Sequence, residues 1–146
     1  MARQAAVLYV VIVLALTLLP VFGLDSDKPV RVDMTLFGSL SRAVAHGVLL
    51  PYFAFLLGNL ALFAPVGVLV PRVLGRSSAV LVFLTALVFS TAIELTQLAV
   101  DLFVGFEYRT PSLDDVIVNV TGAIVGYAVF GALVRTPRRR PPNTVV

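Results

Sequence analysis

The chain has 146 residues, of which 59% are hydrophobic and only 13% are charged. A soluble domain is about half apolar and about a quarter charged, so this composition excludes an ordinary soluble domain and predicts a single integral membrane domain. The net charge is +3, and the arginines flank apolar runs, which indicates a signal for membrane orientation and not nucleic-acid binding. The sequence lacks cysteine and has a single histidine, His46, which excludes disulfides, thiolate catalysis and the usual metal sites. We therefore expect neither a metal nor a cofactor.

The first predicted element is a transmembrane helix over residues 5–24. It is apolar apart from Tyr9, Thr17 and Pro20, and about 20 helical residues are needed to cross a bilayer core of roughly 30 Å. The alternative is a cleaved signal peptide, with Arg3 at its basic end and cleavage after Gly23. The apolar run is at the upper limit for a signal peptide and has the length of a span, which favours the span.

Residues 34–50 follow in the first loop. Apolar residues recur there at helical spacing, and polar residues occupy the other positions. This pattern predicts a short amphipathic helix that lies on the outer membrane interface.

Three further spans are predicted over residues 51–70, 78–104 and 113–134. With the first span they give an all-α fold, a four-helix transmembrane bundle that forms one domain over residues 1–134. Residues 135–146 are basic and rich in proline, so we expect a disordered tail near anionic head groups.

Arginine placement orients this bundle. Arg3, Arg72, Arg76 and the arginines of the tail fall on one side, and every acidic residue except Glu94 falls on the other. An excess of Lys and Arg marks the cytoplasmic side, so both termini are predicted in the cytoplasm of a multi-pass plasma-membrane protein.

Polar residues inside the spans are costly to bury and need an explanation. Glu94 and Gln97 share one face of the third span, Asp115 and Asn119 share a face of the fourth, and Asn59 lies about two turns inside the second. All fall near one level, which predicts a polar cavity that opens outward, with Arg109 at its mouth and paired with Glu94, Asp114 or Asp115.

Structural roles compete with this interpretation. Asn59 and Gln97 could join helices by hydrogen bonds, and Ser112, Asp114 and Asp115 suit a helix N-terminus. Glu94 favours a function, because a carboxylate deep in a span is rarely structural. Gly122 and Gly126 indicate close helix packing, and we expect His46 on the interfacial surface.

Three sequence blocks resemble the VanZ-like family. They are residues 59–67 (NLALFAPVG), residues 90–97 (STAIELTQ) and residues 109–126, which begin RTPSLDD. The resemblance implies a four-helix bacterial membrane protein, and the family's namesake is associated with low-level resistance to the glycopeptide teicoplanin. Ser112 departs from the family pattern, which often has an acidic residue there.

Three function classes follow. The leading hypothesis is a cell-envelope protein that binds a membrane lipid, a lipid-linked cell-wall precursor or another amphiphile through the polar cavity, with Arg109 as the anion contact. The second is a membrane-embedded enzyme that uses Glu94 and Asp115 as general acid and base. The third is a small proton-coupled transporter or channel.

Overall fold

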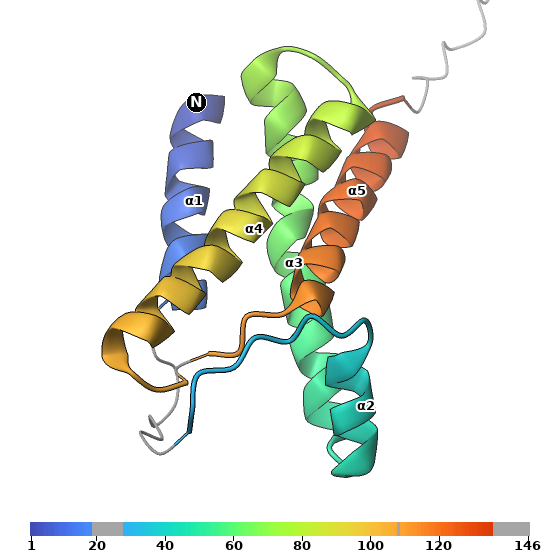
Figure 1. Ribbon diagram of the computed structural model, residues 1–146. Helices are drawn as coiled ribbons and strands as arrows, with labels where there is room; N and C mark the ends of the chain where they lie inside the picture. The colour runs from blue at the N-terminus through green and yellow to red at the C-terminus, as the bar shows by residue number, and fades with distance from the viewer. Residues whose placement is uncertain (19–27, 108, 136–146) are drawn as a thin grey trace, which may run out of the picture.

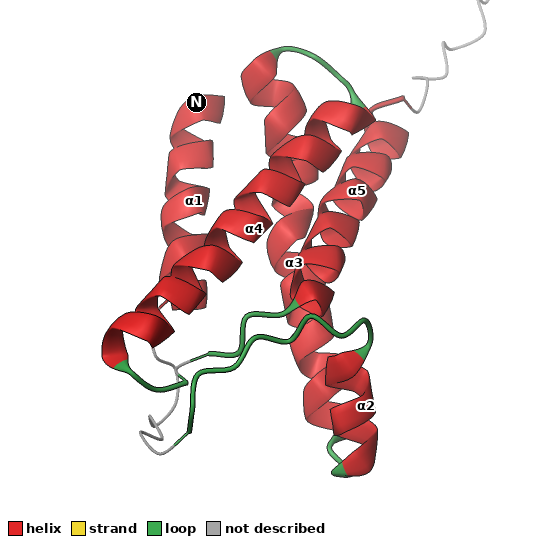
Figure 2. Ribbon diagram, in the orientation of Figure 1, coloured by secondary structure: helices red, strands yellow, loops and turns green. Residues whose placement is uncertain are grey.

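The computed structural model describes residues 1–18, 28–107 and 109–135, and within these ranges the chain consists of helices joined by loops (Figure 2). This confirms the all-α prediction. The helices are α1 (Ala2–Leu18), α2 (Gly38–Ala45), α3 (Leu49–Leu74), α4 (Ala79–Val104) and α5 (Leu113–Arg135).

Three of the helices are long and apolar enough to cross a membrane, namely α3, α4 and α5 as far as Leu133. Many of their large apolar side chains point outward and stay exposed, which suits a lipid environment better than water. The first predicted span overlaps α1, but its residues 19–24, the cleavage site considered after Gly23 and the tail from residue 136 all lie outside the described residues.

Local signals in the sequence explain where these helices begin and end. The Ser78 hydroxyl accepts a hydrogen bond from the Leu81 amide at 3.4 Å and caps the start of α4. Gly75 and Gly105 follow α3 and α4 with φ angles of 64° and 83°, a left-handed conformation that glycine adopts without strain. The bounds of α3, α4 and α5 therefore lie within a few residues of the three later predicted spans.

Three glycines bring α3 and α5 into backbone contact. A methyl group added to Gly67 would lie close to the Ala123 carbonyl, and one added to Gly122 or Gly126 would collide with the Leu60 or Ala64 carbonyl. Such closeness is typical of small-residue membrane interfaces. Gly122 and Gly126 thus mark helix packing, as the sequence predicts.

The other helices close around this pair. Phe63 of α3 is fully buried and lies 5.6 Å, ring centre to ring centre, from Phe89 of α4. On α1, Val13 is fully buried, and the Tyr9 hydroxyl donates to the Leu62 carbonyl at 2.7 Å. The described part of α1 is therefore packed into the same core as α3 and α4.

The long loops between helices lie at one end of the molecule. Figure 1 shows α2 and the long loops before α2 and α5 together at that end, whereas the N-terminus and the short α3–α4 turn lie at the other. Helix α2 is shorter than the predicted segment 34–50. It begins after Phe37, which has a φ of 59°, and ends before Gly47, which has a φ of 67°.

Candidate functional site

The site is built on two loops that are far apart in the sequence. The Asp33 amide donates to the Pro111 carbonyl at 2.9 Å, and the Leu113 amide donates to the Asp33 carbonyl at 3.0 Å. A further bond joins the Glu107 amide to the Lys28 carbonyl at 2.9 Å. Figure 1 shows the two loops running side by side beneath α4 and α5. The loops thus form one layer across this end of the helices.

Asp114 fixes the position of α2. Its carboxylate accepts the Phe37 amide at 2.8 Å and the Ser39 amide at 3.1 Å, and α2 has no side-chain cap of its own at Phe37. An anionic acceptor at a helix N-terminus satisfies free amides and opposes the helix dipole. Asp114 therefore caps a helix, as one interpretation of the sequence held, but the helix is α2.

Asp33 adds a second attachment for α2. Its carboxylate is nearly buried, accepts the Thr35 amide at 3.0 Å and forms an ion pair with Arg42 of α2. Burial alone would raise the pKa of Asp33, but the hydrogen bond and charge of Arg42 and the Thr35 amide outweigh it, so the pKa lies below its ordinary value. The carboxylate thus stays ionised at neutral pH and holds Arg42.

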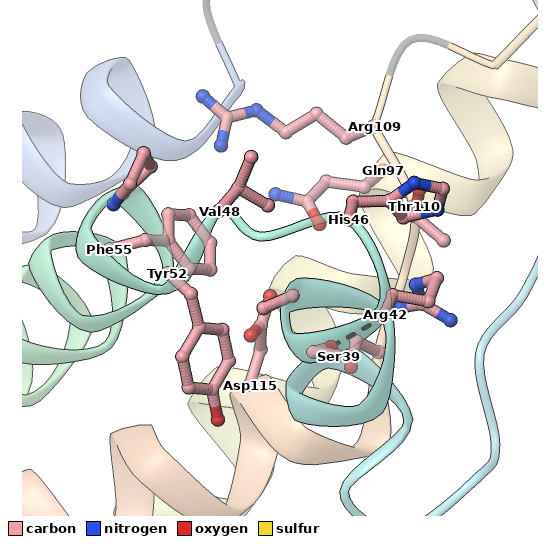
Figure 3. Close-up of a pocket in the computed structure, with 13 residues that line it drawn as sticks. Ser39, Arg42, His46, Val48, Tyr52, Phe55, Gln97, Arg109, Thr110 and Asp115 are labelled. Carbon is pink, nitrogen blue, oxygen red and sulfur yellow. Dashed lines mark hydrogen bonds between the residues drawn. The ribbon is translucent and has the colours of Figure 1, made fainter.

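Between α2, α3, α4 and the loop before α5 lies a cavity of about 400 Å³. Figure 3 shows its walls, with Ser39, Arg42 and His46 from α2 and its end, Tyr52 and Phe55 from α3, Gln97 from α4, and Arg109 and Asp115 from the second loop and α5. The lining mixes aromatic and aliphatic side chains with cationic and polar ones. The cavity can therefore contact an apolar group and a polar or anionic group at once.

The predicted site residues separate into two groups. Gln97, Arg109 and Asp115 line the cavity. Glu94 is buried just behind it, where its Oε2 accepts the Ser112 amide at 2.8 Å, and Ser112 itself is part of the lining. Glu94 and Asp115 both lie within electrostatic reach of Arg109.

The remaining predicted residues are not part of the lining. Asn119 of α5 is buried and donates to the hydroxyl of Ser90 on α4 at 2.9 Å, so it joins two helices and does not line the cavity, contrary to the prediction. Its side-chain oxygen is buried and lacks a hydrogen-bond partner among the described residues. Asn59 is half-buried on α3, and Asp114 faces α2.

Arg109 and Gln97 also connect the site to α1. The Arg109 guanidinium donates to the Leu16 carbonyl at 3.3 Å, and the Gln97 amide donates to the Thr17 carbonyl at 3.0 Å. The backbone amide of Arg109 donates to Asp101 at 3.2 Å. The last turn of the described α1 is therefore held by two polar side chains of the cavity wall.

Sequence reasoning missed Arg42, Tyr52 and Thr110 as lining residues, and the structure places all three at the cavity. His46 is exposed, as expected, and it also lines the cavity. Periodicity assigns a residue to a helix face, but it cannot show which face a short loop helix turns toward the bundle. The one available signal is that Arg42 and His46 lie one turn apart on that helix.

Comparison with known proteins gives one clear match. A family model described as VanZ/LLP1 matches residues 6–134, which covers α1 to α5 and therefore every residue of the cavity. Neither the curated proteins nor the solved structures that were searched contain a match.

Proposed function

The chain belongs to the VanZ/LLP1 family, and from this premise we propose that it is a multi-pass protein of the bacterial plasma membrane whose outward-facing cavity binds an amphiphilic envelope molecule. In this proposal α1, α3, α4 and α5 form a four-span bundle. Helix α2 lies on the outer interface, and both termini are cytoplasmic. The three long apolar helices support the membrane location, and the distribution of arginines supports the orientation.

The observation that carries the proposal is the mixed lining of the cavity. Tyr52 and Phe55 offer apolar surface, and Arg42 and Arg109 each contribute a guanidinium group, from opposite sides of the view in Figure 3. Arginine forks suit phosphate and carboxylate groups, and apolar pockets with a few polar groups are typical small-molecule sites. A lipid-linked molecule with an anionic head group matches both parts.

Arg42 and Arg109 would have different roles in such a complex. Arg42 is already paired with Asp33, so its charge is partly neutralised. Arg109 donates to a neutral backbone carbonyl and interacts with Glu94 and Asp115 through its charge, without a direct ion pair to either of them, so its N–H donors are less engaged than those of Arg42. We therefore assign the principal anion contact to Arg109, with Gln97 and Asp115 as hydrogen-bonding partners for the polar part of the ligand.

Glu94 supports binding better than acid–base catalysis. Its Oε2 accepts a backbone amide of the loop that carries Arg109, Thr110 and Ser112. A group engaged in this way positions the wall of the cavity. The family's namesake is associated with low-level resistance to teicoplanin, and a site for a lipid-linked cell-wall precursor is compatible with such a role.

The test is lipid retention by the full-length protein purified in a mild detergent from a bacterial membrane. Mass spectrometry should find an anionic amphiphile with the wild type, and Arg109→Gln should lower its occupancy about tenfold, since a charge-assisted hydrogen bond is worth about 1.5–3 kcal/mol. Arg31→Gln is the matched control, because Arg31 lies in the same outer layer but outside the cavity lining.

Equal retention by the wild type and Arg109→Gln would refute the assignment of Arg109. Turnover of the retained molecule by the detergent-solubilised protein would replace binding by catalysis as the function. Flux across sealed vesicles would replace it by transport.

A further inference from the structure

A second polar cavity lies at the other end of the molecule, where α3 ends and α4 begins. Its volume is about 670 Å³, and its walls come from the end of α3, the α3–α4 turn and the last turns of α5. Figure 1 shows α4 beginning beside the C-terminal half of α5 at this end. Arg72 and Arg76, one helical turn apart in the sequence, contribute to its lining.

Arg72 is held in place by an aromatic ring. Its guanidinium carbon lies 4.3 Å from the centre of the Phe130 ring of α5. A cation over the face of an aromatic ring is attracted by the ring, and a guanidinium in such a contact still has N–H donors for another acceptor. The contact with Phe130 therefore favours a position of Arg72 at the cavity wall.

Two hydroxyl groups complete the polar part of the cavity. The Ser77 and Tyr127 hydroxyl oxygens are 3.0 Å apart, so one of them donates to the other. The accepting hydroxyl keeps its own proton for a further acceptor. Both residues line the cavity with the arginines, so it combines cationic and neutral hydrogen-bond donors.

The charged side chains that line this cavity, among the described residues, are all positive. Among the described residues that line it, none is Asp or Glu, and both arginines are exposed. Apolar lining by Pro71, Ala128 and Ala132 continues along α3 and α5 toward the membrane-spanning part. We infer that this cavity binds the phosphate group of an anionic membrane lipid, with the acyl chains along the apolar surfaces of α3 and α5.

This site is separate from the outer cavity and does not depend on its function. Arginines at a cytoplasmic membrane boundary can act through their charge alone, by orienting the protein and attracting anionic lipid. The structure adds a guanidinium that lies over an aromatic ring, paired hydroxyls and a concave surface. If the site is specific, lipid binding should depend on where an arginine lies, and not only on the number of arginines at this end.

The experiment compares two charge-equivalent variants of the full-length protein in detergent. Native mass spectrometry would follow binding of added phosphatidylglycerol, with phosphatidylcholine as the zwitterionic reference. Arg76→Gln should weaken phosphatidylglycerol binding about tenfold, by loss of a charge-assisted hydrogen bond. Arg3→Gln removes the same charge from the same end, outside the cavity, and should bind as the wild type does. Arg76 is preferred to Arg72 because its loss leaves the contact between Arg72 and Phe130 intact.

Inorganic phosphate is added in a second arm. It should compete only weakly, because it lacks the acyl chains that lie on the apolar walls. Equal weakening by Arg76→Gln and Arg3→Gln would overturn the inference in favour of diffuse attraction. Unchanged binding by Arg76→Gln would overturn the site itself. Inorganic phosphate binding as tightly as phosphatidylglycerol would overturn the lipid assignment.

Discussion

Glu94 shows at the scale of one residue how a buried carboxylate can shape a site without lining it. It lies on α4, and its side chain accepts the Ser112 amide 18 residues further along the chain. A buried amide left without an acceptor costs about 1–3 kcal/mol. This contact therefore holds the loop that presents Arg109 and Thr110 to the cavity.

Two substitutions of Glu94 distinguish the role of its hydrogen bond to Ser112 from the role of its negative charge. In Glu94→Gln the amide oxygen can still accept the Ser112 N–H, so we expect the free energy of unfolding to change by less than about 1 kcal/mol and the ligand to be retained. Glu94→Leu removes the acceptor, and we expect it to destabilise the protein by about 1–3 kcal/mol and to abolish retention. Thermal unfolding in detergent and lipid mass spectrometry provide the two measurements.

A folded Glu94→Gln protein that loses its ligand would show that the negative charge itself is needed. In that case the carboxylate would act on Arg109 or on a proton, and not on the loop.

The roles of single residues are also what the sequence predicts least well. The spacing of Glu94 and Gln97 places both on the buried face of α4, where the structure has them. The same spacing cannot distinguish Gln97, which lines the cavity, from Asn119, which bonds Ser90 below it. That difference depends on how the helices tilt against each other, and no single helix encodes it.

At the scale of helices, the α3–α5 pair is the tightest contact of the fold. Gly67 faces the backbone of α5, and an added methyl carbon would lie 2.1 Å from the Ala123 carbonyl oxygen. Backbone atoms cannot rotate away as a side chain can, so the helices would have to separate. Gly58 lies on the same helix with nothing within 4 Å of an added methyl carbon.

Gly67→Ala should therefore lower the free energy of unfolding by about 1–3 kcal/mol, the usual effect of overpacking. Gly58→Ala should be neutral or slightly stabilising, because alanine is the better helix former. The comparison is made by thermal unfolding in detergent. Equal stability of the two variants would mean that α3 and α5 are free to move apart at this contact.

Sequence patterns predicted these long helices well, because a run of about 20 apolar residues has few alternatives in a membrane protein. They predicted α2 less well. Its true bounds, Gly38–Ala45, are set by the backbone turns at Phe37 and Gly47 and by a carboxylate from α5. A cap that comes from 77 residues away in the sequence leaves no local signal.

On the scale of the whole molecule, the two ends differ in character. One end carries α2, the paired loops and nearly all acidic residues that the structure describes, and the other carries the α3–α4 turn with Arg72 and Arg76. Positive charge is retained on the cytoplasmic side of bacterial membranes. The arrangement therefore predicts one orientation in the membrane.

Reporter fusions test this orientation. A reporter at either terminus should be cytoplasmic, and one inserted near Pro29 should be extracytoplasmic. Mass analysis of the mature protein should also find the first predicted span still attached. Reporters at the two termini on opposite sides of the membrane would rule out four spans, and a mature N-terminus at Leu24 would identify the first segment as a signal peptide.

The capping of α2 by Asp114 has a consequence for biosynthesis. The acceptor for the Phe37 and Ser39 amides is synthesised 75–77 residues after them. Asp33 likewise pairs with the segment that leads into α5. While the ribosome is still making α3 and α4, the outer layer has neither its cap nor its partner loop. The cavity can therefore form only after α5 has been synthesised and has packed against the other helices, so docking of the last helix is the step that completes the candidate site.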